Sequence, residues 1–115
     1  MKQLDLARFQ KSRESTVQVG AWQFTVRRPS ALDVARLGAD GGRISLEFAC
    51  RFVVGWSGVT EADLLPGGDP EPVEFSDALF GAWIADQPDA WNAIVSGVIE
   101  AYQRHEAAQA ERGNV

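Results

Sequence analysis

Cysteine and histidine, side chains that often carry catalysis or bind metals, are scarce in this chain and far apart. Cys50 is the only cysteine and His105 the only histidine. A lone cysteine forms no intramolecular disulfide and excludes a cysteine-rich zinc site, so Cys50 is interpreted as a small buried hydrophobe. His105 lies between Arg104 and Glu106 and lacks a partner at the spacing of a nucleophilic or metal site. It is expected to be solvated.

Two polar segments have part of the composition of ligand-binding loops and lack the rest. An acidic loop carries Asp63, Asp69, Glu71 and Glu74. An EF-hand needs ligands at alternate positions, and Pro70 and Pro72 break that spacing. The segment 38–42 lacks the Lys-Ser/Thr of a P-loop and is interpreted as a helix end with a linker. The sequence therefore predicts no catalytic residue, no cofactor site and no metal site.

Length and charge limit the remaining classes. A chain of 115 residues fits one domain with one core, and 45% apolar with 23% charged residues is globular. The net charge of −5 argues against nucleic acid and against an anionic membrane surface. No apolar stretch reaches the roughly 20 residues of a membrane span, and no secretory leader is recognised. We therefore expect no nucleic-acid or membrane partner and a cytoplasmic site of action.

The N-terminal half contains the strand signals. Residues 1–15 are polar and are expected to form a flexible lead-in, with a short helical turn near 4–9. Apolar and polar residues then alternate over 16–28 across Gly20-Ala21, which predicts a β-hairpin with its turn at that pair. Its shared apolar face would hold Val17, Val19, Trp22, Phe24 and Val26. Such a hairpin is marginal alone and must pack on other elements.

Helical patterns account for most of the rest. Ser30 is a predicted N-cap with Asp33 completing a capping box, for a helix ending at Gly38. A second helix is predicted over 43–54 from the spacing of Ile44, Phe48 and Phe52. A loop over 57–75 with a short helical turn at 61–65 leads to a helix capped by Ser76. Pro88 begins the last helix, whose apolar stripe ends at Tyr102.

Together these elements predict an α+β domain over 16–105, with the hairpin packed on about four helices and a solvated helical extension over 106–115. The apolar residues flanking the 57–75 loop are expected to hold it against the domain, because an untethered loop of that length is unusual. Four tryptophans are many for this length, and core packing is the default for each. Trp56, at the loop, is the one we select as a candidate protein contact, together with Val59 and Phe75.

One pattern resembles a known family. Val54-Gly55-Trp56-Ser57-Gly58-Val59, then an acidic Gly/Pro loop, then Pro72-Val73-Glu74-Phe75-Ser76 is similar to the tail assembly chaperones of long-tailed (siphovirus-type) bacteriophages and prophages. Arg28-Pro29-Ser30 at a helix start is a further similarity. The resemblance spans roughly residues 16–105, its specific part is 51–76, and the loop here is longer and richer in proline than the simplest versions.

The resemblance implies a non-enzymatic protein that binds the tape-measure protein and helps bring tail-tube subunits to it. It would act in the cytoplasm of the bacterial host and be absent from the mature virion. A homo-oligomer is compatible with the sequence. One alternative is a structural head-tail or tail completion protein incorporated in the virion. Another is a small enzyme or ligand-binding module, against which the scarcity of reactive side chains argues.

Overall fold

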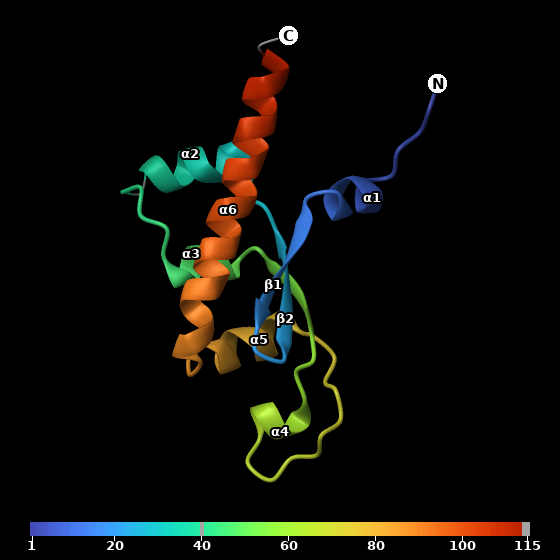
Figure 1. Ribbon diagram of the computed structural model, residues 1–115, viewed down its shortest axis with the longest axis vertical. Helices are drawn as coiled ribbons and strands as arrows, with labels where there is room; N and C mark the ends of the chain where they lie inside the picture. Colours follow the sequence, from blue (N-terminus) through green and yellow to red (C-terminus); the bar gives the residue numbers. More distant parts are fainter. Residues whose placement is uncertain (40, 114–115) are drawn as a thin grey trace.

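The computed structural model describes residues 1–39 and 41–113. Figure 1 shows an antiparallel sheet crossed by a long C-terminal helix, with shorter helices around both. The elements in chain order are α1 (Leu6–Lys11), β1 (Glu14–Val19), β2 (Trp22–Arg27), α2 (Ala31–Ala39), α3 (Leu46–Cys50), β3 (Val53–Ser57), α4 (Glu61–Leu64), α5 (Asp77–Ile84) and α6 (Pro88–Gly113). The predicted α+β class is confirmed. Asp40, within the predicted 38–42 linker, lies outside the described residues.

The predicted hairpin is confirmed with its turn. β1 pairs antiparallel with β2, and Val19 lies opposite Trp22, which leaves Gly20-Ala21 as the two-residue connection. Gly20 has φ of 58°, in the left-handed region that such hairpin turns require. Val17 lies opposite Phe24, so the five predicted apolar residues share one face. β1 begins at Glu14, so the sheet includes the last two residues of the predicted lead-in.

The predicted helix over 43–54 is wrong. Only α3 is helical there, capped by Ser45, and the chain then forms β3, which pairs antiparallel with β2. The register shifts between Thr25 and Val26, so Val54 falls outside the pairing. β-Branched and aromatic residues favour a half-buried strand, and a third strand stabilises a hairpin that is marginal alone. Val53, opposite Val26, is 3% exposed and joins the core.

Most predicted helix starts are confirmed by their capping bonds. The Asp33 carboxylate accepts from the Ser30 backbone N–H at 2.9 Å, and Ser30 Oγ accepts from the Asp33 N–H at 3.1 Å. Ser76 Oγ accepts from the Leu79 N–H, which begins α5. Pro88 is the first residue of α6. α2 ends at Ala39, one residue beyond the predicted stop.

The hydrophobic core lies between the apolar face of the sheet and helices α3, α5 and α6. Its buried members are Phe24, Val26, Ala49, Val53, Val59, Phe80, Trp83, Ile84, Ala90, Ile94 and Val98. Gly97 of α6 lies directly over Val17 of β1, so the missing side chain lets the helix approach the sheet closely. The core is therefore built by α6 lying across the hairpin.

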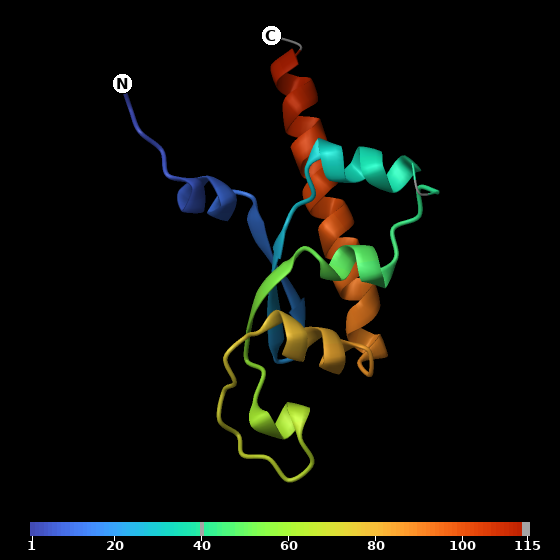
Figure 2. The same ribbon diagram turned by 180° about the vertical axis from the view of Figure 1, so that it is seen from behind.

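The molecule is elongated, with extents of 57 × 40 × 22 Å and a radius of gyration of 16.2 Å. A compact chain of this length would have a radius of gyration of about 13 Å. Figures 1 and 2 show why: α1 and the end of α6 project at one end, and the loop with α4 extends at the other. The N-terminal segment and the end of α6 thus lie toward the same end of the molecule.

Candidate protein-binding surface

Hydrogen bonds join the two sides of the loop that follows β3, and a further bond joins the loop to β3 itself. We call residues 58–76, including α4, the tail-side loop. The Val73 N–H donates to the Val59 carbonyl at 2.9 Å, and the Ala62 N–H donates to the Asp69 carbonyl at 2.8 Å. The Trp56 indole Nε1–H donates to the Val73 carbonyl at 2.7 Å. The expected attachment of this loop is confirmed.

A capping box fixes the start of α4 within this loop. Thr60 Oγ1 accepts from the Asp63 N–H, and the Asp63 carboxylate accepts from the Thr60 N–H at 2.8 Å. That backbone bond is the main reason why the pKa of Asp63 lies below its ordinary value. Asp63 therefore serves as a cap.

The three residues selected from the sequence as protein contacts lie together at the base of the tail-side loop. The Trp56 ring packs edge-on against Phe75, with centroids 5.3 Å apart, and against Trp83 at 5.6 Å. Trp56 and Phe75 are partly exposed, whereas Val59 is 1% exposed and belongs to the core. Their geometry is that of a loop attachment, and their role as protein contacts stays a prediction.

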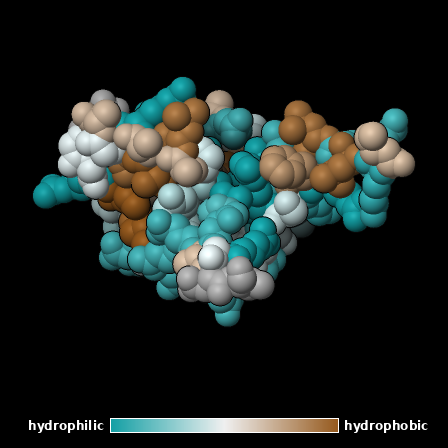
Figure 3. Space-filling view, turned by 90° about the horizontal axis from the view of Figure 1, so that it is seen from above, coloured by the Kyte–Doolittle hydropathy of each residue, from teal (hydrophilic) through white to brown (hydrophobic). Residues whose placement is uncertain are grey.

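Several exposed apolar side chains lie at the opposite end of the molecule, while Leu65 and Leu79 are exposed on the loop and on α5. Leu4, Leu6 and Phe9 are 57%, 68% and 43% exposed, and Leu32 on α2 is 57% exposed. Seen from above, Figure 3 shows two hydrophobic areas, over the α1 and α2 ends, separated by a hydrophilic stretch. We call Leu4, Leu6 and Phe9 the α1 apolar patch. Neighbouring exposed apolar residues of this kind are typical of protein-binding surfaces.

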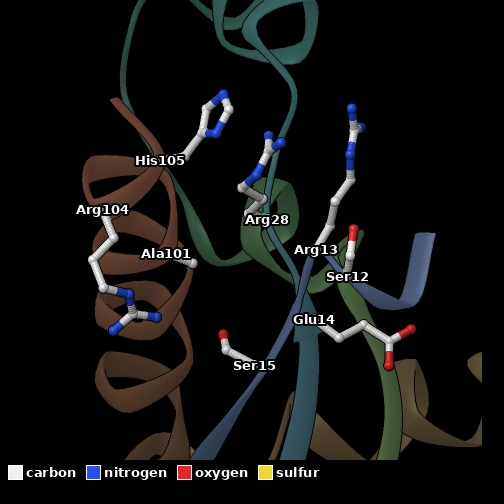
Figure 4. A pocket seen from close by; sticks show the side chains of 8 residues that line it. All are labelled: Ser12, Arg13, Glu14, Ser15, Arg28, Ala101, Arg104 and His105. Carbon is white, nitrogen blue, oxygen red and sulfur yellow. The ribbon is translucent and has the colours of Figure 1, made fainter. Parts of the chain in front are cut away.

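A pocket of about 250 Å³ lies beside this patch, where the hairpin ends meet α6. Its lining residues are Ser12, Arg13, Glu14, Ser15, Arg28, Ala101, Arg104 and His105. Figure 4 shows Arg28 between His105 and Arg13, with the Glu14 carboxylate turned away from them. We call Arg13, Arg28, Arg104 and His105 the basic cluster.

The hairpin register brings two members of the cluster together. The Arg28 N–H donates to the Arg13 carbonyl at 2.9 Å, so the two arginines continue the β1–β2 pairing. Two like charges in such a cross-strand position destabilise a hairpin. Glu14 does not compensate them, because it forms an ion pair with Arg27 at 3.5 Å, the one salt bridge found within residues 1–39 and 41–113.

The electrostatics of the pocket reflect this crowding. Burial, followed by the charge of Arg13, lowers the pKa of the Arg28 guanidinium. Desolvation lowers the pKa of His105, and the charges of Arg28, Arg13 and Arg112 act in the same direction, against Glu106. The three arginines make the cluster a concentration of positive charge in a chain whose net charge is −5.

Arg13 connects the pocket to the α1 apolar patch. Its Cζ lies 4.5 Å from the centre of the Phe9 ring, a cation–π arrangement. Its Nε is buried and has no hydrogen-bond partner among the described residues. A ligand that reaches the pocket would thus meet an aromatic ring and a guanidinium group side by side.

The single histidine and the single cysteine both lie at partly buried positions. His105 is partly exposed and lines the basic cluster, a position that the sequence analysis did not predict. It continues the buried α6 stripe of Ile94, Val98 and Ala101, and that spacing was the signal available in the sequence. Cys50 is partly buried, and its desolvation raises the pKa of the thiol.

Sequence reasoning missed the basic cluster as a whole. The register that places Val19 opposite Trp22 also places Arg13 opposite Arg28, which could have indicated the pair. Within the described part of the chain, no group of three or more His, Cys, Asp or Glu side chains is placed to hold a metal ion. The arrangement can bind an anionic group and an apolar group together.

Comparison with known proteins yields no relative for this chain: no protein-family model matches it, and neither the curated proteins nor the solved structures give a significant match. None of the helices formed by residues 1–39 and 41–113 combines the length and the apolar character that crossing a membrane requires.

Proposed function

We propose that this chain is a tail assembly chaperone of a long-tailed bacteriophage or prophage, which binds the tape-measure protein and helps recruit tail-tube subunits without catalysing a reaction. The observation that carries the proposal is the sequence pattern over 51–76, from Gly55-Trp56 to Phe75-Ser76. Trp56 and Val59 hold the tail-side loop there through the bonds to Val73.

The α1 apolar patch supports a role in protein binding. A chaperone for an amphipathic helical client needs apolar surface with a polar rim. Leu6 and Phe9 lie three residues apart on α1 and are both exposed, and Arg13 of the polar pocket lies against Phe9. Such a protein would act in the cytoplasm of the bacterial host during tail morphogenesis.

Co-expression with the tape-measure protein encoded by the same phage tests the proposal. We expect the tape-measure protein to be soluble with this chain and insoluble without it, and to co-purify with it. Leu6→Ser/Phe9→Ser should reduce that solubilisation. The matched control is Leu32→Ser/Leu79→Ser, which changes two exposed leucines outside both the α1 apolar patch and residues 51–76 and should not.

Two outcomes would contradict the proposal. A tape-measure protein that stays insoluble in the presence of this chain would remove its basis. Recovery of this chain in purified mature virions would instead favour the structural head-tail or tail completion protein, which is incorporated in the particle.

A further inference from the structure

The basic cluster has the composition of a site that lacks its counter-ion. Arg13 before β1 and Arg28 after β2 lie side by side, with His105 of α6 next to Arg28 and the Arg104 guanidinium turned away from them (Figure 4). Like charges brought together by folding raise the free energy of the folded state. A bound anion removes that cost, so the pocket favours anionic ligands.

The donors in the pocket suit a carboxylate. Guanidinium groups donate planar, paired N–H groups that match the two oxygens of a carboxylate. The Arg13 Nε is buried, so the outer N–H groups of Arg13 are the ones that face a ligand, and one Arg28 N–H already donates to the Pro29 carbonyl at 3.1 Å. Ser15, on the pocket wall, is a further hydroxyl donor.

The surroundings of the pocket argue for a polypeptide ligand. The Phe9 ring stacks against Arg13, and Leu6 and Leu4, earlier in the same segment, are exposed. A free small anion would use the pocket alone and leave this patch uncovered. A segment with acidic residues beside apolar ones would use both surfaces at once.

We propose that the basic cluster binds carboxylate side chains of an acidic, amphipathic segment of a partner protein, whose apolar side covers the α1 apolar patch. This inference rests on the proposed protein-binding function and adds the chemistry of the segment that is recognised. Arg13 and Arg28 are the principal donors, Arg104 supplies further positive charge from α6, and His105 lines the pocket beside Arg28.

The test uses fluorescein-labelled 18-residue helical peptides with one leucine face, carrying either glutamate or glutamine along its flank. Binding is measured by fluorescence anisotropy at low and high salt. The full chain should bind the glutamate peptide at least about tenfold more tightly than the glutamine peptide, since charge-assisted hydrogen bonds contribute more than about 1.4 kcal/mol. High salt should reduce this difference.

Variants locate the site. Arg13→Gln/Arg28→Gln should lose the preference for glutamate. Arg36→Gln/Arg51→Gln also removes two positive charges, but from exposed positions elsewhere, and should keep the preference for glutamate. Arg104→Gln, which changes an exposed residue of α6, gives a second reading if the double variant does not fold, and should weaken glutamate-peptide binding by a smaller factor.

Equal binding of both peptides, or an unchanged preference in the Arg13→Gln/Arg28→Gln variant, would overturn the proposal. So would saturable binding of inorganic phosphate in the pocket that the glutamate peptide does not displace, because a free anion would then be the ligand. These results are independent of the co-expression experiment. If this chain solubilises the tape-measure protein but shows no preference for the glutamate peptide, the proposed function stands and the carboxylate-binding proposal is wrong.

Discussion

Three tryptophans use the indole N–H to bind a backbone carbonyl of another segment. Trp56 donates to Val73, Trp91 donates to Ile84 at 2.7 Å, and Trp83 donates to Asp63 at 3.2 Å. Partly buried indoles usually satisfy this donor, which gives the side chain both a packing and an orienting role. In Trp56 the bond joins the end of β3 to the far side of the tail-side loop.

Trp56→Phe should loosen the tail-side loop. The substitution keeps a ring against Phe75 and removes the donor to the Val73 carbonyl, so we expect the free energy of unfolding to fall by about 1 kcal/mol. The Val73 amide, which donates to Val59, should exchange with solvent faster. Hydrogen exchange followed by NMR measures this. Trp91→Phe removes a bond of the same length elsewhere and should leave the local opening of Val73 unchanged; equal effects in both variants would contradict the assignment.

His105 should titrate below its ordinary pKa of about 6.5. Desolvation is the leading cause, and Arg28, Arg13 and Arg112 oppose protonation, while Glu106 favours it. Since the folded state then binds fewer protons than the unfolded state, stability decreases as the pH falls through this titration. The imidazole proton shifts in an NMR titration measure the pKa. Arg28→Gln should raise it, and an unchanged pKa in that variant would contradict the proximity of the two side chains.

At the scale of elements, the sequence predicted correctly the caps and turns, whose stabilising contacts lie between residues close together in the chain. The capping bonds between Ser30 and Asp33 and the strand pairs that flank the Gly20-Ala21 turn join residues only a few positions apart. β3 could not be predicted in this way. The apolar residues Phe52 and Val53 continue a helical spacing from Phe48, and a short apolar run fits either period. The pairing partner on β2 decides the outcome, and it lies some 30 residues earlier in the chain.

The contact between α6 and the hairpin depends on Gly97. Alanine there would gain helix propensity, but its Cβ would overlap the Val17 side chain and push the helix from the sheet. We expect Gly97→Ala to lower the free energy of unfolding by about 1–3 kcal/mol. Gly81→Ala on α5 is the matched control, because nothing lies within 4 Å of its added Cβ. It should raise stability by about 0.5–1 kcal/mol. Urea unfolding measures both; a stabilised Gly97→Ala would contradict the close packing.

At the scale of the whole molecule, the two features of interest lie at opposite ends. The tail-side loop carries the residues that the sequence selected, Trp56, Val59 and Phe75. The basic cluster and the α1 apolar patch lie near the projecting end of α6 (Figure 1). The sequence indicated the first because its residues are close along the chain. The second joins residues about 90 positions apart, and only the folded hairpin and helix bring them together.

Truncation of the projecting end of α6 can show which of its residues contribute to stability and which to peptide binding. Residues 106–113 are exposed, whereas Ala101 is 7% exposed and belongs to the buried set. Ending the chain after Ala107 should therefore change the free energy of unfolding by less than about 0.5 kcal/mol and keep glutamate-peptide binding. Ending it after Gln103 removes Arg104 and His105 and should weaken that binding while the core still unfolds cooperatively. Thermal unfolding and peptide anisotropy measure the two effects. If the product that ends after Ala107 does not fold, the extension contributes packing. If the product that ends after Gln103 keeps full peptide affinity, the carboxylate contacts lie on the hairpin alone.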